Sequence, residues 1–213
     1  MAYNSGSKLY DLNPSRGFMD ISDWEIVDKF DDAFLSSVTI DGAVYGAPQS
    51  STQAGAVIYY KPDYEELKLE VPHTWDEFVD NCKTLADAGK TPVYFTGGET
   101  WATQVLFLGD YYNIAAANPT FADDYTEGKA KYADVPEATR SWTKYEDLVD
   151  YLNADKSAAT VTDGNFAIAT GEATHWFILT QQLPLILENV EDPDDIGVFG
   201  VPGDDADDHG LTV

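Results

Sequence analysis

A continuous apolar run at residues 54–60 constrains the fold of this 213-residue chain more than any other feature. Its length suits a strand, and a run without polar alternation is typical of a strand buried on both faces of a sheet. A helix with a clear start follows, because Thr74 can cap its N-terminus and Glu77, three residues later, completes a capping box. A buried strand followed by such a helix favours an α/β fold.

More strands and helices are expected along the rest of the chain. The pattern predicts strands at residues 92–95, 173–179 and 196–201, and helices at residues 100–112, 136–153, 165–170 and 180–188. Alternation of strands with helices favours a parallel sheet.

A tight hairpin is expected before the buried strand. Residues 38–40 and 44–46 flank Asp41 and Gly42. Asp-Gly between two short apolar segments is a strong hairpin signal, because both residues tolerate the turn conformation that hairpins prefer.

Three tryptophans occupy apolar positions of expected helices. Residues 24–34 have helical spacing with Asp23 as the N-cap, and Trp24 belongs to this segment. Trp75 and Trp142 belong to the helices that follow Thr74 and residue 136. We expect all three side chains to lie in the core.

The chain is strongly acidic. It carries 38 acidic and 12 basic side chains, for a formal net charge of -26, while 44% hydrophobic residues argue against disorder. Such a charge repels phosphate backbones, so nucleic acid is not an expected partner, but it does not exclude a neutral ligand. Two accounts of the acidity stay open: solubility, and adaptation to high salt.

Cysteine and histidine patterns predict no metal, cofactor or thiol chemistry. Cys82 is the only cysteine and is expected to be a small buried residue. No paired-cysteine or paired-histidine spacing suggests zinc. The Asp-rich residues 192–195 and 204–208 could suggest a calcium site, because carboxylate oxygens bind calcium. They lack the ligand spacing of an EF-hand and are expected to be solvated turns.

Targeting signals are not evident in the sequence. No apolar run reaches the roughly 18 residues of a membrane span. Residues 1–8 lack the charged and apolar regions of a signal peptide, so this chain is expected to carry no export signal.

Four short segments follow one another in a recognisable order. They are residues 41–48 with 59–61 (DGAVYGAP and YYK), residues 72–78 with 89–92 (PHTWDEF and GKTP), residues 163–173 (DGNFAIATGEA) and residues 192–203 (DPDDIGVFGVPG). Their joint order and spacing resemble the sugar-type extracellular solute-binding proteins of ABC transporters, family 1, which includes maltose-binding proteins.

This resemblance implies a two-lobed α/β fold of the periplasmic-binding-protein type II. Residues 1–48 would be a remnant of lobe one leading into the first crossover, residues 49–201 the α/β domain of lobe two, and residues 202–213 the start of the return crossover. Because family members are roughly twice as long, as two lobes of ordinary domain size require, we expect this chain to be an internal fragment.

The resemblance also implies a function. The full-length protein would be the non-catalytic carbohydrate-binding component of an ABC importer, with a sugar as ligand and a membrane permease as partner. It would be extracellular or periplasmic, as a membrane-anchored lipoprotein. The fragment alone is not expected to form the whole cleft, and the oligomeric state stays open.

Glu99 and Trp101 inherit a ligand-binding role from the resemblance, because the matching loop of the family carries an acid and an aromatic that face the cleft. An indole can cover the apolar face of a sugar ring. The alternative is that Trp101 packs in the core beside Val105 and Leu106, while Glu99 favours the helix N-terminus.

Four further polar residues are candidate ligand contacts. Gln49, Ser50 and Ser51 lie at the expected crossover, with a solvated hinge as the alternative interpretation. Gln181 stands where family members often carry Trp, so a stacking platform has become a hydrogen-bonding group. This departure argues against a maltodextrin-like ligand.

Two other functions remain as alternatives. A glycoside hydrolase would use two acids, such as Glu99 and Asp163, separated by roughly 5–9.5 Å across a cleft. An acidic interaction domain without a small-molecule ligand would use the same scaffold.

Overall fold

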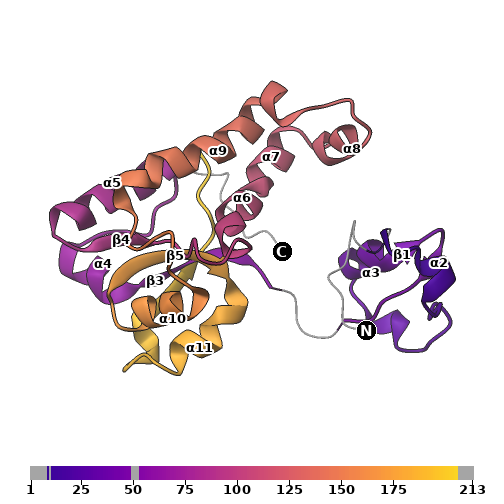
Figure 1. Ribbon diagram of the computed structural model, residues 1–213, viewed down its shortest axis with the longest axis horizontal. Coiled ribbons are helices and arrows are strands. Elements are labelled where there is room, and N and C mark those ends of the chain that lie inside the picture. The colour runs from indigo at the N-terminus through magenta and orange to yellow at the C-terminus, as the bar shows by residue number, and fades with distance from the viewer. Residues whose placement is uncertain (1–8, 10, 49–52, 206–213) are drawn as a thin grey trace. The chain divides into compact units, whose positions relative to one another are not determined.

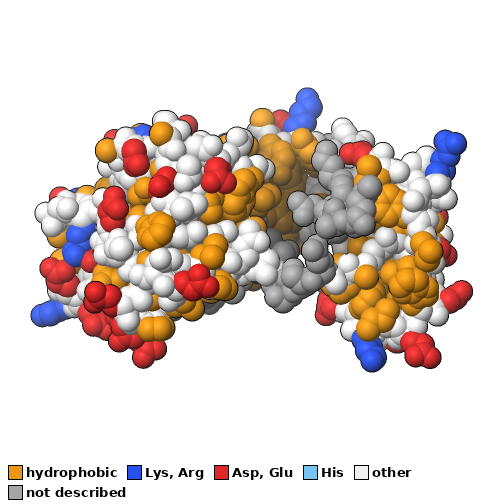
Figure 2. Space-filling view, turned by 60° about the horizontal axis from the view of Figure 1, so that its bottom comes forward, with side chains coloured by type: hydrophobic (Ala, Val, Ile, Leu, Met, Phe, Trp, Pro, Cys, Tyr) orange, Lys and Arg blue, Asp and Glu red, His pale blue; other side chains and the backbone are white. Residues whose placement is uncertain are grey.

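The computed structural model describes residue 9, residues 11–48 and residues 53–205 (Figure 1). Contacts within the chain divide it into two compact units, residues 1–52 and residues 53–213, called unit one and unit two below. Figure 2 shows acidic side chains spread over the visible face, with fewer Lys and Arg side chains among them. The acidity is therefore a general property of this surface.

Unit one has a small core of its own. Its elements are α2 (Pro14–Gly17), the 3-10 helix η1 (Val27–Lys29), α3 (Asp32–Val38), β1 (Thr39–Ile40) and β2 (Ala43–Val44). Strands β1 and β2 pair antiparallel around Asp41 and Gly42, whose φ angles are 52° and 82°. These positive values are those of a tight hairpin turn, so the predicted hairpin is confirmed. The buried side chains are Leu9, Ile21, Val27, Val38, Ile40 and Val44.

The predicted helix at residues 24–34 is wrong. Phe30 adopts an extended conformation (φ -79°, ψ 147°) that ends η1, and a new helix begins at Asp32. The short turn buries Val27 but leaves Trp24 52% exposed. Trp24 is therefore not a core residue: it lies before η1 and outside any helix, so the expected helical spacing does not apply to it.

Unit two is built on a four-stranded sheet. Its strands are β3 (Gly55–Tyr60), β4 (Thr91–Tyr94), β5 (Ala173–Leu179) and β6 (Ile196–Phe199), in the order β4-β5-β3-β6. Strands β4 and β5 are parallel, whereas β3 runs antiparallel to both β5 and β6. The expected parallel sheet is thus wrong. Strand β3 pairs antiparallel with β5, and the helix that follows β3 in the sequence does not determine this direction.

The helices of unit two cover both faces of this sheet. They are α4 (Lys61–Leu67), α5 (Trp75–Asp87), α6 (Val105–Gly109), α7 (Tyr111–Ala117), α8 (Phe121–Thr126), α9 (Pro136–Leu148), α10 (Val161–Ala169) and α11 (Leu183–Leu187), with 3-10 turns η2 (Ala102–Gln104), η3 (Tyr132–Asp134), η4 (Val149–Tyr151), η5 (Thr180–Gln182) and η6 (Pro193–Asp195). In Figure 1, α10 and α11 lie on one side of the strands and α5 on the other.

Two apolar cores form on the two faces. On one face, Ile58 of β3 and Trp176 of β5 pack against α10 and α11. On the other, Val57 of β3 and Phe177 of β5 belong to the core of Trp75, Phe78 and Cys82. Neighbouring strand residues thus serve opposite cores, as the pleat of a strand requires. The predicted buried strand is confirmed, and so are the core positions of Trp75 and Cys82.

Capping boxes begin two of these helices. The Thr74 hydroxyl accepts a hydrogen bond from the Glu77 backbone N–H, and the Glu77 side chain accepts one from Thr74, as predicted. The same arrangement of Thr160 and Asp163 begins α10 at Val161. Helix α10 starts four residues before the predicted start at residue 165. Asp163 lies in its first turn and does not belong to a separate turn before the helix.

Helix α9 buries a different face from the one expected. Trp142 was expected in the core but is 57% exposed, with its ring against Phe107 at a centroid distance of 4.8 Å. The inward face carries Ser141 and Lys144, which look like solvent-facing residues in the sequence.

A buried ion pair holds Lys144 inside. Its Nζ lies 2.5 Å from Asp110 Oδ1, and both side chains are 1% exposed. The Ser141 hydroxyl donates to Asp110 Oδ2 at 2.5 Å, and Lys144 also donates to the carbonyl of Pro202 at 3.0 Å. The pair therefore ties the junction of α6 and α7 to α9 and to the segment that follows β6.

Replacing Lys144 with Met should strongly destabilise unit two. The substitution leaves the buried Asp110 carboxylate without its cation, which typically costs about 3–5 kcal/mol in free energy of unfolding. Lys83→Met on the exposed side of α5 removes the same charge and should cost less than about 0.5 kcal/mol. Urea unfolding of both variants measures the difference, and equal small losses would contradict the assignment.

His175 is a neutral histidine at the centre of β5. Its Nδ1 lies 2.7 Å from the carbonyl of Pro92, which can only accept, so Nδ1–H is the donor. The Tyr64 hydroxyl then donates to Nε2 at 2.8 Å. Complete burial lowers the pKa of His175 to about 3.

Acid should therefore destabilise the fold through His175. The unfolded chain binds a proton near pH 6.5, while the folded chain does so only near pH 3, so this stability is present above about pH 6.5 and is lost as pH falls toward 3. Between about pH 7 and pH 5 the group should contribute a loss of about 2 kcal/mol. His175→Gln should lack this component, and identical losses in the two proteins by urea unfolding would count against it.

Candidate ligand-binding site

Three chain segments meet at one end of the sheet in unit two. Gly55, which begins β3, is paired with Leu179, which ends β5, and Tyr94 at the end of β4 is paired with Trp176 of β5. The segment before β3, the loop after β4 and the turn after β5 therefore project from the same edge. Ends of strands are where ligands commonly bind in α/β sheets.

Thr180 ties two of these segments together. Its backbone N–H donates to the carbonyl of Ala54 at 2.9 Å, and its hydroxyl accepts from the Ala54 N–H at 3.1 Å. The expected ligand contacts Gln49, Ser50 and Ser51 precede Ala54 but lie outside the described residues.

The loop after β4 is shaped by two glycines. The Gly97 N–H donates to the carbonyl of Lys156 at 2.8 Å. A Cβ on Gly98 would lie 2.6 Å from the carbonyl oxygen of Ala158, so no larger residue fits there without movement of the backbone. Close approach of the two segments places Glu99 beside the first turn of α10.

Both carboxylate oxygens of Glu99 are hydrogen-bonded. Oε1 accepts from the backbone N–H of Val161 at 2.9 Å, at the N-terminus of α10, where a negative charge is favourable. Oε2 accepts from the indole N–H of Trp101 at 3.0 Å. The structure therefore brings the two predicted residues into direct contact.

Trp101 presents an oriented aromatic surface. Its side chain is 38% exposed, whereas the neighbouring Ala102, Val105 and Leu106 are buried. The alternative interpretation placed Trp101 in the core beside Val105 and Leu106. Those two side chains are buried, but that of Trp101 is partly exposed. Because Glu99 holds the indole N–H, the ring is fixed with part of its surface in solvent, which suits stacking on an apolar ligand face.

Gln181 lies on the turn after β5 and is exposed. No hydrogen bond within the described part of the chain links it to Glu99 or Trp101. The next residue, Gln182, is buried, and its Oε1 accepts from Asn165 Nδ2 at 3.1 Å. Sequence reasoning missed this buried amide pair, and its only signal was Asn165 directly before the apolar residues 166–169 of α10.

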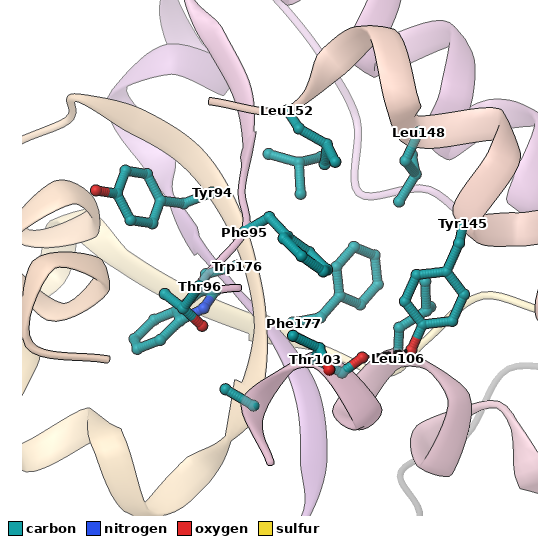
Figure 3. Close-up of a pocket in the computed structure, with 12 residues that line it drawn as sticks. Tyr94, Phe95, Thr96, Thr103, Leu106, Tyr145, Leu148, Leu152, Trp176 and Phe177 are labelled. Carbon is teal, nitrogen blue, oxygen red and sulfur yellow. Dashed lines mark hydrogen bonds between the residues drawn. The ribbon is translucent and has the colours of Figure 1, made fainter. Parts of the chain in front are cut away.

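A small apolar cavity lies beneath this end of the sheet (Figure 3). It measures about 30 Å³, far below the roughly 300–1,000 Å³ of small-molecule sites, so it is not a candidate for a sugar. The lining residues include Val93, Phe95, Ala102, Leu106, Tyr145, Leu148, Leu152 and Phe177.

The two acids of the hydrolase alternative are occupied by structural bonds. Asp163 accepts from the Thr160 N–H at 2.8 Å and from its hydroxyl at 2.7 Å, and these bonds lower the pKa of Asp163. A carboxylate held in the ionised form cannot donate a proton to a leaving group. Glu99 already accepts two hydrogen bonds, so neither acid is arranged for glycoside hydrolysis.

Of the two Asp-rich segments, residues 192–195 and 204–205 are described, whereas Asp207 and Asp208 lie outside the described residues. No group of three or more His, Cys, Asp or Glu side chains of the described residues could hold a metal ion. Asp192 instead accepts from the Asp194 N–H at 3.0 Å, and Asp204 pairs with Arg140 at 3.0 Å. Within the same residues, every helix falls short of the length and apolar character needed to cross a membrane.

Most of this chain matches a known protein family. The model of the bacterial extracellular solute-binding protein family matches residues 11–209. The chain belongs to this family. Membership confirms the family expected from the four segments, and it assigns the chain to a group of non-catalytic binding proteins and not to the glycoside hydrolases.

Two curated relatives are sugar-binding by name. The chain is 27% identical over 191 residues to the multiple sugar-binding protein of Streptococcus mutans, covering 84% of this chain and 43% of that protein. It is 26% identical over 209 residues to a diacetylchitobiose-binding protein of Streptomyces coelicolor, covering 97% and 46%. The chain thus spans less than half the length of these relatives.

Solved structures of solute-binding proteins share the fold. A chitin oligosaccharide-binding protein matches with a TM-score of 0.78 at 22% identity, over 93% of this chain and 50% of that one. The protein RafE in complex with raffinose matches with a TM-score of 0.78 at 24% identity, over 97% and 54%. The expected periplasmic-binding-protein-like α/β fold is therefore confirmed, and the match covers about half of each structure.

Proposed function

We propose that this chain supplies one side of the ligand cleft of a sugar-binding protein that serves an ABC importer. The observation that carries the proposal is the Glu99–Trp101 pair, which fixes a part-exposed indole at the strand-end edge of unit two. Family membership and the sugar-binding names of the relatives support it.

Sugar recognition needs an apolar surface together with hydrogen-bonding groups. The Trp101 ring would cover the C–H face of a sugar ring, and the exposed amide of Gln181 would bond its hydroxyls. Gln49, Ser50 and Ser51 would add polar groups from the crossover. A hydrogen-bonding group at Gln181 in place of a stacking ring argues against a maltodextrin-like ligand.

The parent protein would work as two lobes that close on the sugar. Residues 1–48 would belong to lobe one, residues 49–201 to lobe two, and residues 202–213 would begin the return crossover. The family is extracellular by description. A lipid anchor on the parent protein and delivery of the sugar to a membrane permease complete the proposal.

Titration calorimetry against a panel of mono- and oligosaccharides tests this function. We expect the full-length parent protein to bind at least one sugar, and this chain to bind it weakly or not at all, because only one side of the cleft is present. Trp101→Ala in the parent should weaken binding by about tenfold, the value of one aromatic stacking contact.

Trp142→Ala is the matched control, because Trp142 is also an exposed tryptophan but lies on α9. This variant should bind sugar as the unmodified parent does. Two results would overturn the proposal: a parent protein that responds to no sugar, or equal weakening by the two substitutions.

A further inference from the structure

Tyr145 reaches from α9 to the segment that carries Trp101. Its hydroxyl donates to the carbonyl of Thr103 at 2.7 Å and accepts from the backbone N–H of Phe107 at 3.1 Å. Figure 3 shows the Tyr145 side chain directed from its own helix toward Thr103 and Leu106. Burial raises the pKa of Tyr145 to about 12, so the phenol keeps the proton that it donates.

These two hydrogen bonds interrupt a helix. An unbroken α-helix would join the Phe107 N–H directly to the Thr103 carbonyl, four residues earlier. Here the Tyr145 hydroxyl bonds to both groups, and the chain divides at this point into the 3-10 turn η2 and the helix α6. Insertion of a side chain into the hydrogen-bond ladder is a known cause of a change in helix direction.

The form of η2 sets the direction of Trp101, which directly precedes this turn. A 3-10 turn rotates by about 20° more per residue than an α-helix, so conversion of η2 to α-helix would turn Trp101 by about 60° about the helix axis. The Glu99 carboxylate is also held by the Val161 N–H of α10, outside this segment. Its bond to the indole therefore depends on the present form of η2.

Empty space beside η2 leaves room for the other form. The apolar cavity of about 30 Å³ is lined by Ala102 and Thr103 of η2, by Leu106 of α6 and by Tyr145. Protein interiors are otherwise closely packed, and a filled core would resist a shift of the turn. Packing alone therefore does not hold η2 in place, and the Tyr145 hydroxyl supplies the missing restraint.

We propose that Tyr145 is a positioning residue for the aromatic surface of the sugar site. Its hydroxyl keeps η2 in the 3-10 form, and this form presents the Trp101 ring in the direction that Glu99 fixes. Tyr145 does not touch the sugar and acts only through Trp101. The inference rests on the proposed sugar-binding function, because it assigns a role within that site.

Tyr145→Phe in the 213-residue chain tests the positioning step without any sugar. The Trp101 indole N–H gives one resonance in a proton–nitrogen NMR spectrum, identified by its absence in Trp101→Phe. In Tyr145→Phe this resonance should shift, and its proton should exchange with solvent about fivefold faster, the equivalent of one net hydrogen bond. Thermal stability should change little, because the freed Thr103 carbonyl and Phe107 N–H can bond to each other.

Tyr151→Phe is the matched control. Tyr151 packs against the same core as Tyr145, but its hydroxyl makes no hydrogen bond to η2 or α6, both of which lie within the described residues. Its removal should leave the Trp101 resonance unchanged. An unmoved resonance in Tyr145→Phe, or equal shifts in the two variants, would overturn the proposal.

Titration calorimetry of the full-length parent protein, with a sugar that it binds, tests the consequence for the ligand. Tyr145→Phe should weaken binding by about fivefold in the unmodified parent and again in Gln181→Ala. It should add nothing in Trp101→Ala, because a residue that acts through the ring has no effect once the ring is absent.

The outcomes separate this inference from the proposed function. If Trp101→Ala weakens binding but Tyr145→Phe does not, the positioning role is wrong and the sugar function stands. The same fivefold loss in Trp101→Ala would show a general structural effect and also overturn the role. A parent that binds no sugar overturns the proposed function and this role within it, while the indole resonance decides separately whether Tyr145 orients the ring.

Discussion

The antiparallel pairing of β3 with β5 is the interaction on which the rest of unit two depends. It joins Gly55 to Leu179 across most of the unit's sequence, so its formation closes a long loop at an entropic cost. Burial of both strands on both faces offsets that cost, because each strand contributes to two apolar cores. The same pairing brings the segment before β3 and the turn after β5 to one edge, so the architecture and the candidate ligand site have a common origin.

Local signals predicted local structure well. The hairpin at Asp41 and Gly42, the capping box at Thr74 and the buried strand all depend on residues within a few positions of one another. Features set by distant partners were missed. Lys144 reads as a surface residue until its partner Asp110, 34 residues away, is placed beside it, and the inward face of α9 then shifts away from Trp142. The direction of β3 was missed for a similar reason.

The candidate site shows the same division between residue identity and geometry. Resemblance to the family pointed to Glu99 and Trp101, but no sequence pattern predicts that the acid would hold the indole with one oxygen and cap α10 with the other. In the proposed site, Glu99 would therefore act by positioning the indole and not by chemistry of its own. It gives the aromatic ring a defined direction, and a defined direction reduces the entropy lost when a ligand stacks on it.

Glu99 also connects the loop after β4 to the first turn of α10. Its Oε1 accepts from the Val161 N–H, and its Oε2 accepts from the Trp101 indole N–H. Loss of this carboxylate would release the indole and leave the N-terminus of α10 without one of its acceptors. The direction of the aromatic ring and the stability of α10 are therefore linked through one side chain.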